Sequence, residues 1–118
     1  MKPTHALASS IRSSRLTISV LVSLTAMPMD SISGARWLSE RGVRLRFLFL
    51  DGAHDEQSVR ADLQAFLPLM LPGSWIALDD ARPDGPFPGV YRAYESLLKP
   101  RAREVAWGGP MLLVQLSS

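Results

Sequence analysis

Two short apolar runs, each followed at once by aspartate, constrain the fold of this chain more than any other feature. Leu45 to Leu50 reads LRFLFL and ends at Asp51, and Ser74 to Leu78 reads SWIAL and ends at Asp79-Asp80. Short apolar runs bounded by turn residues are typical of strands buried on both faces of a sheet. The segment between them, Asp55 to Met70, repeats apolar residues at helical spacing. The pattern predicts a strand, a helix and a strand, which is the unit of a parallel α/β sheet.

The rest of the chain continues this alternation. On the helix over 55–70, Asp62 falls on the face predicted to be exposed, and Pro68 is expected to loosen the last turn. The other predicted elements are a helix from Asp30 or Ser31 as cap to Glu40, ended by Gly42, a proline- and glycine-rich loop over 82–89, a helix over 88–98, and hairpin strands over 103–107 and 111–116. This order predicts an α/β fold with a mostly parallel sheet, a C-terminal antiparallel strand and helices on both faces.

Residues 1–29 differ from the remainder of the chain. Lys2, Arg12 and Arg15 precede an apolar stretch over 16–26, an arrangement that a signal peptide would also show. Serines and threonines dilute the stretch, and Ala26-Met27-Pro28 is a poor cleavage site, so we favour a strand over 16–26 to an export signal. A membrane span would need about 20 apolar residues. We therefore predict an atypical N-terminal segment at 1–29 and the main part of one domain at 30–118.

Composition excludes several function classes. The chain has 118 residues, of which 47% are hydrophobic and 20% charged, and this balance predicts a single globular domain. Its net charge of +2 comes from scattered basic side chains without a basic stripe, which argues against nucleic-acid binding. The chain has no cysteine, so disulfides, thiolate metal sites and a cysteine nucleophile are excluded. A reducing compartment fits this, and we expect the protein to be cytoplasmic and not bound to membranes.

The aspartates at the strand ends are the candidate site. Ligands of parallel α/β sheets bind beyond the carboxyl ends of the strands. If the two strands are neighbours, about 4.8 Å apart, then Asp51, Asp79 and Asp80 share one crevice. The alternative stays open at this point, because acidic residues beside glycine and proline are ordinary turn residues. His54 likewise has two interpretations, a surface histidine near a helix start or a catalytic base.

The segment FLFLDGAHDEQSVRADLQAFLPLMLPGSWIALDDA resembles class I, Rossmann-like S-adenosylmethionine-dependent methyltransferases, in the small-molecule branch that includes catechol O-methyltransferases. Residues 50–54 match the family pattern I-D-G-x-H, residues 59–63 match V-x-x-D-L, and Pro72-Gly73 matches the turn before the next strand, where Ser74 replaces a second glycine. The similarity is dense over 30–80 and fainter beyond. It implies that 30–118 is the C-terminal part of a methyltransferase domain.

The resemblance also implies an activity and a set of site residues. The expected reaction is methyl transfer from S-adenosylmethionine to a small molecule, at oxygen, assisted by Mg²⁺. A hard cation on carboxylates lowers the pKa of a bound hydroxyl, which then attacks the methyl group. The implied roles are Asp51 and His54 in catalysis, Asp30, Ser31 and Asp51 at the cofactor, and Asp51, Asp79 and Asp80 at the metal.

One family feature has no counterpart in this chain. The glycine-rich cofactor loop should precede the Asp30 region by one or two strand-helix units, each of about 30 residues. Only 29 residues precede Asp30, and no G-x-G occurs. The chain is then either truncated, which we favour, or a relic. An alternative function is therefore a non-catalytic or truncated remnant that binds a partner chain or a second copy through an open edge of the strand over 45–50.

Overall fold

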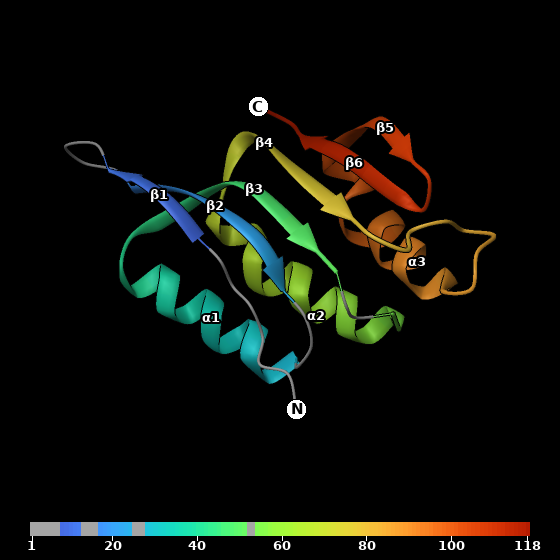
Figure 1. Cartoon of the computed structure of the whole chain (residues 1–118), viewed down its shortest axis with the longest axis horizontal. Coiled ribbons are helices and arrows are strands. Elements are labelled where there is room, and N and C mark those ends of the chain that lie inside the picture. The colour runs from blue at the N-terminus through green and yellow to red at the C-terminus, as the bar shows by residue number, and fades with distance from the viewer. Residues whose placement is uncertain (1–7, 13–16, 25–27, 52–53) are drawn as a thin grey trace.

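The computed structural model describes residues 8–12, 17–24, 28–51 and 54–118, with side chains from residue 32 onward (Figure 1). Its elements are β1 (Ala8–Arg12), β2 (Thr17–Leu24), α1 (Pro28–Glu40), β3 (Val43–Leu50), α2 (Glu56–Phe66), the 3₁₀ turn η1 (Leu67–Leu69), β4 (Met70–Leu78), α3 (Pro88–Leu97), the 3₁₀ turn η2 (Lys99–Arg101), β5 (Ala102–Gly108) and β6 (Met111–Leu116). The predicted α/β class is confirmed.

The described strands form one sheet in the order β1-β2-β3-β4-β6-β5. The pairs β2–β3 and β3–β4 are parallel, whereas β1 and β6 run antiparallel to their neighbours. The C-terminal antiparallel strand is thus confirmed, and it lies between β4 and β5. β1 was not predicted. β2 falls inside the strand expected over 16–26, and it pairs with β3. The prediction that β3 has an open edge is therefore wrong. Among the described strands, β1 and β5 are the outer ones.

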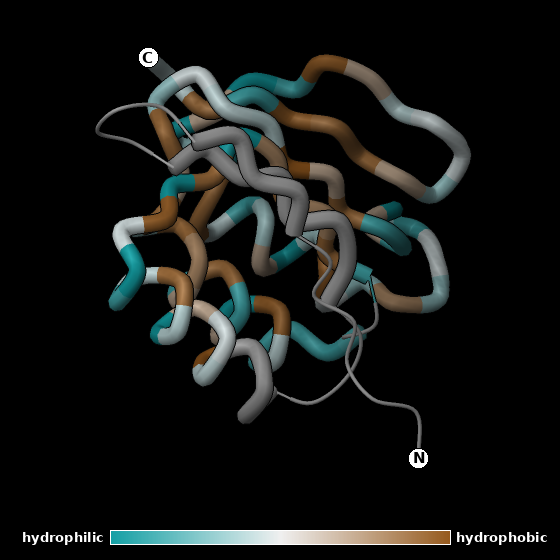
Figure 2. Tube along the Cα trace, turned by 60° about the vertical axis from the view of Figure 1, so that its left-hand side comes forward, coloured by the Kyte–Doolittle hydropathy of each residue, from teal (hydrophilic) through white to brown (hydrophobic). Residues whose placement is uncertain are grey.

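The prediction of helices on both faces is wrong for the described elements. Helix α2 contacts both α1 and α3, and Figures 1 and 2 show the three helices in one layer. The reason is topological. The crossovers from β2 to β3, from β3 to β4 and from β4 to β5 all move across the sheet in the same direction. Right-handed crossovers that never reverse direction place every helix on the same face.

The core lies between this helix layer and the sheet, where the apolar segments of Figure 2 face each other. The sheet side chains that point to the helices are fully or almost fully buried: Val43, Leu45, Leu48, Leu50, Ile76, Leu78, Leu112 and Val114. On the opposite face Phe47, Phe49 and Trp75 are only half-buried. β3 is therefore not buried on both faces, as its continuous apolar run suggested, because no described helix covers the second face.

Local chemistry explains the ends of α1. The helix begins at Pro28, so Asp30 and Ser31 lie in its first turn and neither is the cap that the sequence suggested. Proline is favoured at the first helical position because its missing N–H is not needed there. Gly42 follows the helix with φ of 69°, a left-handed conformation that favours glycine. The predicted stop at Gly42 is confirmed.

Helix α2 and strand β4 differ from the prediction at their junction. Asp55 caps α2, and its carboxylate accepts a 2.9 Å hydrogen bond from the Ser58 N–H. The α-helix ends at Phe66 and continues as η1, in agreement with the loosening expected at Pro68. β4 begins at Met70, four residues before the predicted Ser74. Its register with β3 is irregular there, and Gly73 has φ of 77°.

Candidate active site

The carboxyl ends of β3 and β4 bring the predicted acidic residues together. Leu50 and Leu78 pair in register, and the Asp79 N–H donates a 3.0 Å hydrogen bond to the Leu50 carbonyl. Asp51 and Asp79 therefore leave adjacent strands at the same level. The two strands are neighbours, which was the condition for a shared crevice, and their aspartates meet at one edge of the sheet.

The carboxyl groups of Asp51 and Asp79 are in contact. Burial raises the pKa of Asp51, and the charge of Asp79 and a side-chain hydrogen bond with Asp79 raise it further. Asp80 adds to this rise through its charge, whereas His54 lowers the pKa. Two carboxylates that close favour sharing one proton over full ionisation.

Asp80 is directed to His54 instead. The Nε2 atom of His54 lies 2.9 Å from Oδ2 of Asp80, and the two side chains are 41% and 28% exposed. Asp80 has φ of 56°, the left-handed region that costs a non-glycine residue roughly 1 kcal/mol or more. Among the described residues it is the one non-glycine residue with positive φ. Such strain at a strand end is typical of a functional position.

Phe87 completes this group from the other side. Its ring stacks on the imidazole of His54, with 3.8 Å between centroids and 11° between the planes. Phe87 directly precedes α3, whose first residue is Pro88. His54 therefore bridges two loops, the one after β3 and the one after β4. Phe87 lies in the proline- and glycine-rich loop that the sequence predicted over 82–89.

The described side chains do not fit the predicted metal site. Asp51, Asp79 and Asp80 do lie at one edge, but Asp80 is hydrogen-bonded to His54. In the part of the chain that the structure describes, no group of three or more His, Cys, Asp or Glu side chains is arranged to hold a metal ion. We therefore derive no step of the reaction through a metal.

A further acidic residue, Asp62, lies beneath the site. The sequence placed it on the exposed face of α2, but it is 7% exposed. Together with Asp51, Asp79 and the surrounding apolar side chains it lines a cavity of about 10 Å³. The correction follows from α3, which packs so closely on α2 that a Cβ on Gly89 would lie 2.6 Å from the Glu56 nitrogen. The helix pattern alone contains no signal for this contact.

The loop after β4 is held against the β5–β6 hairpin. The Arg82 Nε donates a 3.0 Å hydrogen bond to the Gly109 carbonyl, and its guanidinium lies 4.5 Å from the centroid of the Trp107 ring. The Ala81 N–H donates to the Pro110 carbonyl over 2.9 Å. These contacts fix the start of the loop that carries Phe87.

The predicted cofactor residues Asp30 and Ser31 follow the same edge of the sheet as Asp51 does. β2 runs parallel to β3, with Leu24 beside Leu50, and α1 follows β2. The first turn of α1 therefore comes after the same edge as Asp51. The side chains of Asp30 and Ser31 lie outside the described residues. Their role at the cofactor stays a prediction.

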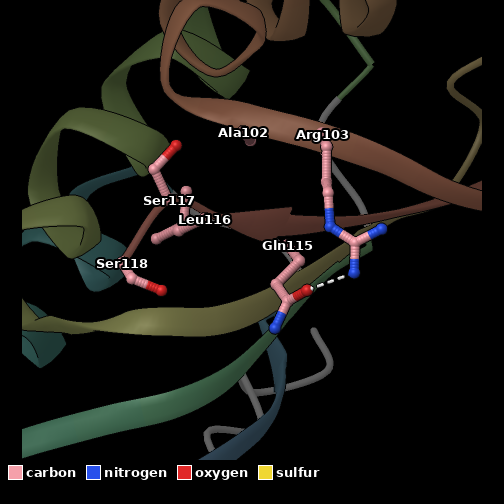
Figure 3. A pocket seen from close by; sticks show the side chains of 6 residues that line it. All are labelled: Ala102, Arg103, Gln115, Leu116, Ser117 and Ser118. Atoms are coloured by element: carbon pink, nitrogen blue, oxygen red, sulfur yellow. Dashed lines mark hydrogen bonds between the residues drawn. The ribbon is translucent and has the colours of Figure 1, made fainter.

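A larger hollow lies at the opposite edge of the sheet. It is lined by the start of β5, the end of β6 and the last residues of the chain: Ala102, Arg103, Gln115, Leu116, Ser117 and Ser118 (Figure 3). Arg103 donates a 2.7 Å hydrogen bond to Oε1 of Gln115, and the amide of Gln115 donates to the Gly73 carbonyl over 3.0 Å. These polar side chains form hydrogen bonds between neighbouring strands, and they lie far from the carboxyl ends of β3 and β4.

Comparison with known proteins defines the class. Residues 7–81 match the model of a family described as a methyltransferase domain, which is more than half of the chain. The chain belongs to this family. The match begins before β1 and ends just after β4, so it includes Asp51, His54, Asp79 and Asp80. No curated protein matches the chain.

Three solved structures with a similar fold are O-methyltransferases. The TDP-rhamnose 3'-O-methyltransferase CalS11 of calicheamicin biosynthesis has a TM-score of 0.58 and 24% identity, covering 73% of this chain and 38% of that one. An O-methyltransferase from Bacillus cereus in complex with SAH has a TM-score of 0.54 and 20% identity, and the match covers 75% of this chain and 47% of that one. The O-methyltransferase NovP has a TM-score of 0.52 and 18% identity, and the match covers 64% of this chain and 31% of that one. At these identities the likeness shows the fold, and this chain spans less than half of each.

Proposed function

We propose that this chain takes part in methyl transfer from S-adenosylmethionine to an oxygen atom of a small molecule. The family membership supports the methyl transfer, and the three O-methyltransferases of similar fold support oxygen as the acceptor atom. One observation carries the location of the site. Asp51, Asp79, Asp80 and His54 gather where β3 and β4 end, which is where ligands of such sheets bind.

The residues have separate tasks in this proposal. The cofactor supplies a methyl group on a sulfonium sulfur, and what the protein must mainly add is the position of the acceptor. Asp51, in the loop after β3, would face both cofactor and acceptor, and Asp30 and Ser31 would contact the cofactor from the start of α1. His54 and Asp80 would lie beside the acceptor hydroxyl, with Phe87 next to them.

The metal-assisted form of the reaction is a separate prediction. Magnesium held by Asp51, Asp79 and Asp80 would compete with the hydrogen bond between Asp80 and His54. It therefore predicts that magnesium tightens cofactor or acceptor binding by this chain, and calorimetry with and without magnesium makes this comparison.

A second candidate function is a non-catalytic half that binds a partner chain. It is favoured by the half-buried Phe47, Phe49 and Trp75 on the sheet face opposite the helices. Sedimentation velocity separates the candidates. A monodisperse monomer that binds S-adenosylmethionine contradicts the second one.

The test of the first candidate is calorimetry of the chain with S-adenosylmethionine and with SAH, each with and without magnesium. Binding is expected with the parent and weaker binding with Asp51→Asn. The matched control is Asp84→Asn, an exposed aspartate in the loop after β4, which should bind as the parent does. Absence of heat with both ligands, at protein concentrations of tens of micromolar, would contradict the proposal for this chain. TDP-rhamnose and catechol then serve as probe acceptors for transfer of a labelled methyl group.

A further inference from the structure

We propose that the outer strand β5 positions the loop after β4 (residues 79–87) and thereby determines how tightly the acceptor binds. Two residues, Arg82 in the loop and Glu104 in β5, make this connection. They are positioning residues, because they act on the acceptor through the loop. This role rests on the proposed function, in which the acceptor lies at the edge where the loop begins.

The loop after β4 joins this edge of the sheet to the start of α3, next to the β5–β6 hairpin (Figure 1). It begins at Asp79, which contacts Asp51, and it ends at Phe87, whose ring centroid lies 3.8 Å from that of His54. Ligands of parallel α/β sheets bind beyond this edge, so the loop borders the place proposed for the acceptor. Its conformation therefore sets the shape of one side of the site.

The middle of the loop is exposed and stiff. Residues 82–84 and Pro86 are exposed, and the Gly85 N–H donates a local hydrogen bond of 3.2 Å to the Arg82 carbonyl. Each proline of the loop fixes its own φ at about −65°, which leaves the loop few internal ways to relax. A displacement at either end is therefore carried along the loop to Phe87.

The first end of the loop is held by the β5–β6 hairpin. The Ala81 N–H donates to the Pro110 carbonyl over 2.9 Å, and the Arg82 Nε donates to the Gly109 carbonyl over 3.0 Å. The guanidinium of Arg82 also lies 4.5 Å from the centroid of the Trp107 ring. This is a cation–π contact, for which tryptophan is the most favourable ring. Since Trp107 belongs to β5, the strand contacts the start of the loop through this ring.

The second end of the loop is held through α3. Phe87 directly precedes this helix, and the buried Tyr94 on the same helix donates a 3.3 Å hydrogen bond to Oε2 of Glu104. The indole N–H of Trp107 donates to Oε1 of the same carboxylate, also over 3.3 Å. Glu104 therefore links the ring that contacts Arg82 to the helix that follows Phe87. Both ends of the loop depend on this one carboxylate.

These contacts differ from the core in what they contribute to stability. Arg82 and Glu104 are both exposed, and water competes for contacts between exposed polar groups, so such contacts are weak. β5 is also an outer strand and pairs on one side only. Loss of the connection should therefore displace the loop and leave the unfolding of the chain nearly unchanged.

The loop and the predicted cofactor residues lie on opposite sides of β3. Asp30 and Ser31 come after β2, which pairs with one side of β3, whereas the loop comes after β4, which pairs with the other. A displaced loop should therefore weaken binding of the acceptor and leave binding of S-adenosylmethionine unchanged.

Nuclear magnetic resonance tests the connection without activity. Glu104→Gln keeps the size of the side chain but leaves one acceptor oxygen instead of two, so one of the two hydrogen bonds is lost. The amide signals of Asp84, Gly85 and Phe87 are expected to shift. Arg103→Gln, on the same strand and hydrogen-bonded across to β6, is the matched control and should leave these signals in place. Unchanged loop signals in Glu104→Gln overturn the proposal.

The start of the loop is tested by the order parameters of the same three amides. They should be about 0.85 in the parent and fall below about 0.6 in Arg82→Ala. Trp107→Phe keeps a ring beside Arg82 but removes the N–H donor, and should give intermediate values. The unfolding midpoint of Arg82→Ala should stay within about 3 °C of the parent. A rigid loop in Arg82→Ala, or an equal loss of order in α2, contradicts the proposal.

Activity then separates this role from the proposed function. With S-adenosylmethionine and TDP-rhamnose or catechol, Arg82→Ala should raise the KM of the acceptor about tenfold or more, and change the Kd of S-adenosylmethionine less than about twofold. Arg82→Lys keeps the charge beside Trp107 and should recover part of the loss, and Arg103→Gln should match the parent. Equal weakening of acceptor and cofactor overturns the proposal. If the parent transfers no methyl group, the proposed function fails for this chain and the acceptor role with it, and the amide signals still decide whether β5 holds the loop.

Discussion

The helix-covered face of the sheet and the edge where β3 and β4 end differ in what their side chains contribute to stability. On the face, residues such as Leu63, Ile76 and Leu112 are fully buried against apolar neighbours. At the edge, Asp80 has a strained backbone and the pKa of Asp51 is raised by burial and by other carboxylates. The face is therefore built for stability and the edge holds groups that cost stability. That division is expected of an active site supported by a rigid sheet.

The largest effect is expected at the face. Leu63→Ala removes a fully buried side chain at the centre of α2 and should lower the free energy of unfolding by about 3 kcal/mol. Gln64→Ala, at the exposed neighbouring position, is the control and should change it by less than about 0.5 kcal/mol. Urea unfolding followed by circular dichroism measures both. Equal values for the two variants would show that α2 does not pack on the sheet as described.

The next effect concerns the contact between α2 and α3 that positions the site. Gly89→Ala places a Cβ 2.6 Å from the Glu56 nitrogen, so the helices must separate, at a cost of roughly 1–3 kcal/mol. Gly34→Ala is the matched control, because a Cβ there meets no atom within 4 Å. It should stabilise α1 by about 0.5–1 kcal/mol. If both substitutions stabilise the chain, the close approach of the two helices is wrong.

At the edge where β3 and β4 end, a substitution should change stability in the opposite direction, because removing a charged group there should stabilise the chain. The pKa of Asp51 is raised in the folded state, so the unfolded chain ionises first as pH rises. Between the unfolded and the folded pKa the ionisation of Asp51 progressively destabilises the fold, and above both the penalty is complete. Asp51→Asn should therefore stabilise the chain at pH 7, on the order of 0.5 kcal/mol after solvent screening. The gain should vanish near pH 3.

Asp84→Asn is again the control for this prediction, and thermal unfolding at pH 3 and pH 7 is the measurement. A destabilising Asp51→Asn substitution at pH 7 would remove the contrast between edge and face. A stabilised variant that has also lost cofactor binding would strengthen it, because residues kept at the cost of stability are typical of functional sites.

The sequence predicted the face better than the edge. The alternation of apolar runs and helical periods specified β3, α2, β4, α3 and the final hairpin, because these depend on local spacing. It also placed Asp51 and Asp79 together on the condition that the two strands are neighbours, and the structure meets this condition.

What could not be predicted depends on contacts between distant residues. The single helix layer follows from the order of strands in the sheet, and the burial of Asp62 follows from α3. The turning of Asp80 toward His54 follows from one backbone angle, and no periodicity encodes it. The resemblance gave these acidic residues a cation, and the geometry pairs one of them with a histidine.

The smallest effect at neutral pH concerns a polar group within the face. Tyr94 is 1% exposed, and burial together with the charge of Glu104 raises its pKa to about 12. Its hydroxyl donates a 3.3 Å hydrogen bond to Glu104. Because the unfolded tyrosine ionises near pH 10, stability should fall as pH rises from about 10 to 12 and be unaffected below that range. Titration of phenolate absorbance should show a component with a pKa of about 12, which belongs to Tyr94. Glu104→Gln should lower the pKa of this component, and its absence from the parent would contradict the burial of Tyr94.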